Sequence, residues 1–173
     1  MRRYRFLSLV VVGVMAAALL AGASASAFRA HAAKTTTLKV FFKTTSESFT
    51  NPNGKAVSNS NPPAVGAILF ATDNAYPGTA KHHTAAYTGT AFLYCTVTKV
   101  VSSSNVQATC DGVAAIGGSM ITSISTQNVA SSSPTSVYPI DAGTGKYLGA
   151  TGTVKTTAVG SSGNSNAVIT IKT

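Results

Sequence analysis

Acidic side chains are scarce in this sequence, so any acid–base chemistry must rest on very few residues. The chain contains only Glu47, Asp73, Asp111 and Asp141. Asp73 closely follows the apolar run 67–70. Burial at the end of a strand would raise the pKa of this carboxyl and suit it to proton transfer. Asp73 is therefore the candidate catalytic acid, and the alternative is an Asx-turn cap ahead of Pro77.

The other acids offer less. Asp111 is predicted to face solvent, Glu47 lies beside a polar loop, and Asp141 lies in a glycine-rich corner. A glycosidase needs a pair of carboxylates, and a hard-metal site needs several converging oxygens. Either site would use most of the acids present.

Aromatic residues supply the candidate ligand contacts, which are Tyr87, Phe92, Tyr94 and Tyr147. Tyr87 and Tyr94 differ in parity, so only one of them can face the interior of a sheet. Core packing is the alternative for the inward one, and turn chemistry is the alternative for Tyr147. The pair 82–83, two adjacent histidines, is predicted to lie at the surface, and no metal site is expected.

Several function classes find no support in the sequence. It contains no Gly-x-Ser-x-Gly motif, phosphate-binding loop or His-Glu-x-x-His motif, so hydrolase and nucleotide-dependent activities have no basis. The formal net charge is +9. The basic residues are scattered and do not form a stripe interleaved with aromatics, so no nucleic-acid partner is predicted.

The two cysteines are predicted to form a disulfide. A hairpin turning within 102–105 places Cys95 directly opposite Cys110 on the neighbouring strand. Both share a face with the apolar residues of their strands. Two isolated cysteines lack the spacing of a zinc site or of a Cys-x-x-Cys redox motif.

The elements that must position these residues are all β-strands. Apolar alternation and turn clusters recur, and no helical repeat follows residue 27. The eight predicted strands are 38–43, 65–72, 83–101, 106–116, 119–127, 135–140, 149–158 and 166–172. Eight strands in meander order can close into a barrel that leaves no exposed edge. A two-sheet β-sandwich is the alternative.

One glycine-rich run is specific enough to suggest a family. Residues 142–152 read Ala-Gly-Thr-Gly-Lys-Tyr-Leu-Gly-Ala-Thr-Gly. This run resembles the Gly-Gly-Thr-Gly-Lys-Tyr-x-Gly-Ala-x-Gly signature of allene oxide cyclase and dirigent barrels, with Ala142 at the first glycine. Further pieces follow in order: Phe70-Ala71-Thr72-Asp73, Phe92-Leu93-Tyr94-Cys95, Cys110 and Gly117-Gly118. The chain thus resembles an exported bacterial branch of that family.

The resemblance implies an eight-stranded antiparallel up-and-down β-barrel of calycin-like form. It implies a lumen for a small hydrophobic molecule, no metal or organic cofactor, and frequent homo-oligomers. Such proteins direct cyclisation or stereoselective coupling, so an enzymatic role would be that of a cofactor-free cyclase or isomerase. Thr151 stands where plant dirigent proteins carry Arg, and Asp141 stands where small or apolar residues are usual. A non-catalytic envelope or extracellular protein on the same fold is therefore the alternative.

The first residues resemble a secretory signal peptide, with Arg2, Arg3 and Arg5 ahead of an apolar run at 6–20. The small residues 25–27 predict cleavage after Ala27, and cleavage after Ala32 is the alternative. The predicted organisation is a signal peptide at 1–27, a flexible segment at 28–37 and one barrel domain at 38–173. A secreted or envelope-associated protein is expected, with no membrane span after cleavage.

Overall fold

The computed structural model describes residues 34–130 and 133–173. The predicted signal peptide and residues 28–33 of the predicted flexible segment lie outside the described residues. Across the described ranges, no helix has the length and apolar character needed to span a membrane.

The regular elements of the described chain are β-strands and one short 3₁₀ turn, η1 (Gly145–Tyr147). The strands are β1 (Thr35–Thr50), β2 (Ile68–Thr79), β3 (His82–His83), β4 (Gly89–Ser102), β5 (Asn105–Ile116), β6 (Ser119–Asn128), β7 (Thr135–Ile140), β8 (Ala142–Gly143), β9 (Thr151–Ala158) and β10 (Ser165–Lys172).

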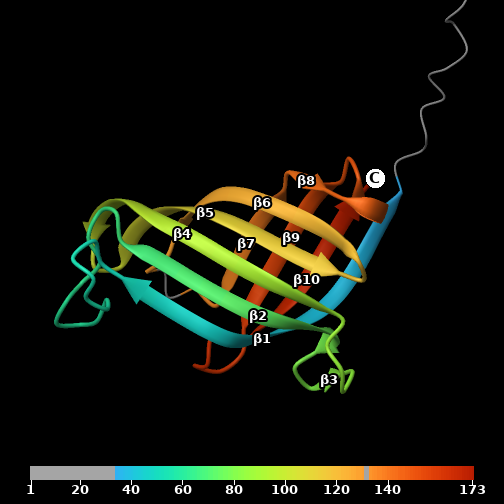
Figure 1. Cartoon of the computed structure of the whole chain (residues 1–173), viewed down its shortest axis with the longest axis horizontal. Coiled ribbons are helices and arrows are strands. Elements are labelled where there is room, and N and C mark those ends of the chain that lie inside the picture. The colour runs from blue at the N-terminus through green and yellow to red at the C-terminus, as the bar shows by residue number, and fades with distance from the viewer. Residues whose placement is uncertain (1–33, 131–132) are drawn as a thin grey trace, which may run out of the picture. The chain divides into compact units, whose positions relative to one another are not determined.

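The strands form an antiparallel sheet with the order β7-β9-β10-β1-β2-β4-β5-β6-β8, while β3 pairs only with β2. The two end strands, β7 and β8, are separated by Asp141 alone, so the sheet curls round into a nearly closed barrel (Figure 1). With β7 and β8 counted as one wall and β3 set aside, the barrel has eight walls in chain order. The prediction of an up-and-down barrel is therefore confirmed over the sandwich alternative.

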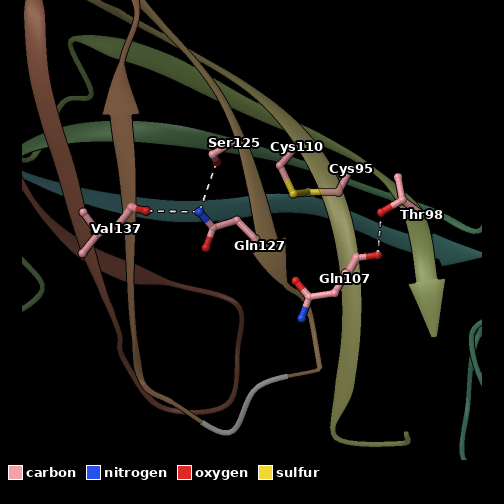
Figure 2. Close-up of a disulfide and its surroundings, with 7 residues drawn as sticks. All are labelled: Cys95, Thr98, Gln107, Cys110, Ser125, Gln127 and Val137. Carbon is pink, nitrogen blue, oxygen red and sulfur yellow. Dashed lines mark hydrogen bonds between the residues drawn. A yellow bond between two sulfur atoms is a disulfide. The ribbon is translucent and has the colours of Figure 1, made fainter. Parts of the chain in front are cut away.

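The barrel closes along a seam between β6 and the β7–β8 wall. The β8 end is paired as a short ladder, and Asp141 donates its backbone N–H to the Thr122 carbonyl at 3.0 Å. Toward the other end no ladder joins β6 to β7. There, Gln127 Nε2 donates to the Val137 carbonyl at 3.1 Å and also contacts Ser125 Oγ (Figure 2). A side chain thus replaces backbone pairing at this part of the seam.

Two apolar clusters lie inside the barrel. Their strand residues follow alternation, because every second residue of a strand faces the lumen, while Ala67, Tyr147 and Ala150 come from the connections. The large core cluster contains Val40, Phe42, Ala75, Ala114, Ile116, Ile121, Ile140, Tyr147, Ala150, Ala167, Ile169 and Ile171. The disulfide core cluster contains Ala67, Cys95, Val97, Val106, Ala108 and Cys110.

The predicted disulfide is present between Cys95 and Cys110, which are directly opposed on β4 and β5 (Figure 2). Both cysteines are buried within the disulfide core cluster, and no free cysteine remains in the described chain. The disulfide therefore links β4 and β5 covalently inside the barrel wall.

The first strand is longer than its sequence pattern predicts. The sequence predicts a strand at 38–43, but β1 runs from Thr35 to Thr50. The polar residues 43–48 stay in the strand because they pair with β2 on one side, with a register shift between Thr44 and Ser46. This shift is a β-bulge, a local kink that sequence alternation does not reveal.

Candidate functional site

The lumen contains a cavity of about 320 Å³. Its lining includes Phe42 and Ile121 of the large core cluster, together with Leu69 and Leu93, which pack against the disulfide core cluster. The cavity therefore lies between the two clusters. Its size is typical of a small-molecule site.

The cavity reaches one end of the barrel. Ser133 and Pro134 from the β6–β7 connection contribute to its lining, as do Gly160 and Gly163 from the β9–β10 connection. The large core cluster fills the lumen toward the other end, where Tyr147 and Ala150 belong to the β8–β9 connection. The cavity therefore opens at the end of the barrel where Pro134 and Gly160 lie.

Polar residues make up a substantial part of the cavity lining. They include a carboxylate pair, Glu47 and Asp73, the hydroxyls of Thr44 and Ser123, the phenol of Tyr138 and the amide of Asn164. A site that binds a small organic molecule usually combines apolar walls with polar groups that orient the ligand.

Asp73 lies on β2, directly opposite Thr44 of β1 and Ala91 of β4. Burial raises the pKa of its carboxyl above the ordinary value. A hydrogen bond with the Thr44 side chain opposes that rise in pKa, and the nearby charge of Glu47 adds to it. The carboxyl thus holds its proton more readily than an exposed aspartate, which suits a general acid or base.

The β1 bulge brings Glu47 to the same cavity. Thr44 pairs with Asp73 and Glu47 pairs with Ala71, so both face the lumen although they are three residues apart. Strict alternation would turn Glu47 outward. Gly163 lies close by, because a Cβ atom added there would come within 2.9 Å of Glu47 Oε2. This placement of Glu47 could not be predicted from the sequence, since an extra residue in a strand has no fixed pattern.

Two further polar groups face the lumen from the opposite side. Tyr138 lies on β7, four walls round the eight-walled ring from the β2 strand that carries Asp73. Burial raises the pKa of the Tyr138 phenol, while a hydrogen bond with the Ser136 side chain lowers it. Ser123 on β6 is 8% exposed, and its Oγ makes no hydrogen bond within the described chain.

The four aromatic residues singled out from the sequence are dispersed. Tyr87 is 54% exposed and packs edge-on against Tyr76. Phe92 and Tyr94 alternate with the inward residues of β4 and are partly exposed, and only Phe92 contributes to the cavity lining. Tyr147 is buried in η1 within the large core cluster, away from the cavity lining.

The remaining candidates lie outside the lumen. Both histidines of the pair 82–83 are exposed, and the His83 ring stacks on Phe41 with 5.1 Å between ring centroids. Asp111 is exposed on β5. Asp141 is also exposed, and its Oδ2 accepts a hydrogen bond from the Ile124 N–H at 2.5 Å, which helps to close the seam.

No protein-family model matches the sequence, and no curated protein matches it either. Solved structures of similar fold do exist. A pyocyanin demethylase aligns with a TM-score of 0.59 at 16% identity, over 78% of this chain and 99% of that protein. A pterocarpan synthase dirigent protein gives 0.58 at 20% identity, over 80% and 94%. An exo-specific intermolecular Diels-Alderase gives 0.62 at 14% identity, over 82% and 98%. These likenesses show that the barrel has the dirigent-like fold that the sequence resemblance implied.

Proposed function

We propose that this protein binds a small, largely apolar molecule in its lumen and directs that molecule's cyclisation or stereoselective coupling. The observation that carries the proposal is the cavity of about 320 Å³, whose walls combine apolar and polar side chains. A barrel that served only as a scaffold would gain stability by filling this space. The similar folds of a Diels-Alderase and of a pterocarpan synthase dirigent protein support the same reading.

In this proposal the apolar walls of the cavity contribute more to the reaction than any single polar group. Phe42, Leu69, Leu93 and Ile121 would hold a flexible substrate in a folded, reactive conformation, which lowers the entropic part of the barrier. Asp73 would serve as the acid, donating a proton to the substrate or stabilising positive charge that develops on it. Tyr138, on the facing wall, would orient the substrate through its phenolic hydroxyl.

The second candidate is a protein that binds its ligand without turning it over. Thr151, at the position where dirigent proteins carry Arg, is exposed at the start of β9, and it is not part of the described cavity lining. Such a protein would retain the cavity but release its ligand unchanged. Incubating the purified protein with its own ligand and analysing the products by chiral chromatography separates the two candidates.

Export by a cleaved signal peptide is also part of the proposal. The buried Cys95–Cys110 disulfide suggests an oxidising compartment, which supports it. The intact mass of protein from the culture medium should correspond to a chain beginning at Phe28, or at Ala33 for the later cleavage. A full-length mass in the medium would contradict this part of the proposal.

Lumen binding can be tested with a variant that fills the cavity. Gly112 lies at mid-strand in β5 and lines the cavity, and a Cβ atom there would make only ordinary contacts, at 3.7 Å or more. Gly112→Leu should therefore fold while its side chain occupies the lumen. Thr109→Leu adds a similar side chain to the exposed face of the same strand and serves as the matched control.

The assay is fluorescence titration with N-phenyl-1-naphthylamine, a neutral apolar probe. Wild type and Thr109→Leu should bind one equivalent with equal affinity, and Gly112→Leu should bind at least tenfold more weakly. Equal binding by all three proteins would place the probe on the outer surface. That result, or an absence of binding to the wild type, would contradict the proposal.

A further inference from the structure

Charge is distributed unevenly between the lumen and the rest of the molecule. The chain carries 13 Lys and Arg residues against four Asp and Glu. Two of those four acids, Glu47 and Asp73, line the cavity, and the described lining contains no Lys, Arg or His. The lumen of a strongly basic protein is thus lined by negative charge alone.

Nothing in the described chain neutralises these two carboxylates. Neither Glu47 nor Asp73 forms an ion pair with a described residue, and Thr44 supplies Asp73 with only a neutral hydrogen bond. Asp73 is partly buried, so its carboxylate is partly removed from water without a cationic partner, which costs free energy. Glu47 is exposed at the cavity, and its nearby negative charge adds repulsion. A bound cation would offset both terms, whereas a bound anion would increase them.

A second, independent group marks the same cavity as a ligand site. Ser123 is more than nine-tenths buried, and its Oγ makes no hydrogen bond within the described chain. It lies beside Gly112, because a Cβ atom added at that glycine would be 3.8 Å from Ser123 Cβ. Buried hydroxyls in folded proteins almost always have a partner. A polar group of the ligand would provide the one that Ser123 lacks.

We propose that the lumen selects an apolar molecule with one positive charge, such as a protonated amine or a cationic aromatic nitrogen. The positive charge would lie between Asp73 and Glu47, and a second polar atom would reach Ser123 on the β6 wall. This inference rests on the proposed function, since it specifies the chemical class of molecule that the same cavity takes. It also assigns a role to the β1 bulge, which places Glu47 on the same face as Asp73.

The test compares three probes with the same naphthalene ring at neutral pH and low salt: 1-naphthylmethylamine, 1-naphthalenemethanol and 1-naphthaleneacetate, the anion of 1-naphthaleneacetic acid. Isothermal titration should show that the amine binds at least tenfold more tightly than the alcohol. The carboxylate should bind most weakly of the three. Added salt should reduce the preference for the amine, because ions screen the attraction.

Matched variants locate the effect. Asp73→Asn and Glu47→Gln keep the shape of each side chain and remove its charge, so each should lower the amine-to-alcohol affinity ratio at least threefold. Asp111→Asn removes the same charge from the exposed face of β5 and should leave the ratio unchanged. Gly112→Leu should abolish binding of all three probes, which separates lumen binding from attraction to the surface.

The outcomes distinguish this inference from the proposed function. Equal affinity for the three probes, or an unchanged ratio in Asp73→Asn and Glu47→Gln, would overturn the preference for a cation and leave a lumen that binds apolar molecules. Tightest binding of the carboxylate would overturn it as well. An absence of binding by any probe to the wild type would overturn both the inference and the proposed function.

Discussion

Removing the Cys95–Cys110 disulfide should destabilise the barrel by an amount that the structure allows to be calculated. The two cysteines are 15 residues apart in sequence. In the chain-entropy model, opening a loop of this length lowers the free energy of unfolding by about 3 kcal/mol. For a domain the size of Lys34–Thr173, each kcal/mol changes Tm by about 3 °C, so the expected fall is roughly 10 °C.

Two forms of the protein separate the loop effect from packing. Reduced wild type keeps both sulfur atoms, so urea unfolding with and without reductant measures the disulfide alone. Cys95→Ala/Cys110→Ala also removes sulfur atoms that are buried in the disulfide core cluster, so it should lose about 1 kcal/mol more. A loss below 1 kcal/mol in the double variant would refute the reasoning. So would the labelling of two free thiols in exported protein without prior reduction.

Three further predictions concern the backbone and the lumen. Gly152→Ala should lower the free energy of unfolding in urea by about 3 kcal/mol or more, because the added Cβ would lie 1.9 Å from the Thr170 carbonyl oxygen. Gly149 has a positive φ but open space around it, so Gly149→Ala should cost only about 1 kcal/mol. Equal losses would contradict the steric argument. Asp73→Asn should have a higher Tm than wild type at pH 7 and an equal Tm near pH 3. The pKa of Asp73 is raised in the folded state, so wild type loses stability as pH rises from the ordinary pKa of 3.8 through the folded pKa. A constant Tm difference across this pH range would contradict the burial argument. Ser123→Ala should leave the free energy of unfolding of the empty protein unchanged or slightly higher, since Ser123 Oγ has no partner in the described chain. The same variant should bind the natural ligand more weakly. A loss of stability above 1 kcal/mol would show that the hydroxyl is hydrogen-bonded.

The fold could be predicted from the sequence because alternation and turns are local signals. Apolar alternation located the eight walls, and the glycine-rich run 142–152 indicated the kind of barrel. The cysteine pairing was also predicted, although the residue pairs near the turn of the hairpin differ from the predicted ones. Ser102 pairs with Asn105, and two register shifts between Val97 and Ser102 restore the predicted alignment of Cys95 with Cys110.

The site was less predictable because it depends on where strands bend. Asp73 was singled out and lies in the cavity lining. Glu47 was overlooked because one extra residue in β1 turns it inward. The parity of Tyr87 relative to Tyr94 could not place it, because Tyr87 precedes β4, which begins at Gly89, and follows a bend in the chain. Tyr138 and Ser123 had no local signal, since only barrel closure brings β6 and β7 round to face β2.

The most direct test of the central claim is native mass spectrometry of the protein purified from its own culture medium. The lumen account predicts that wild type carries one small molecule, which denaturation releases, and that Gly112→Leu prepared in the same way carries none. Circular dichroism should first establish that the variant is folded. Detection of wild type only at the mass of the bare chain would contradict the account. Detection of the same adduct on both proteins would contradict it as well.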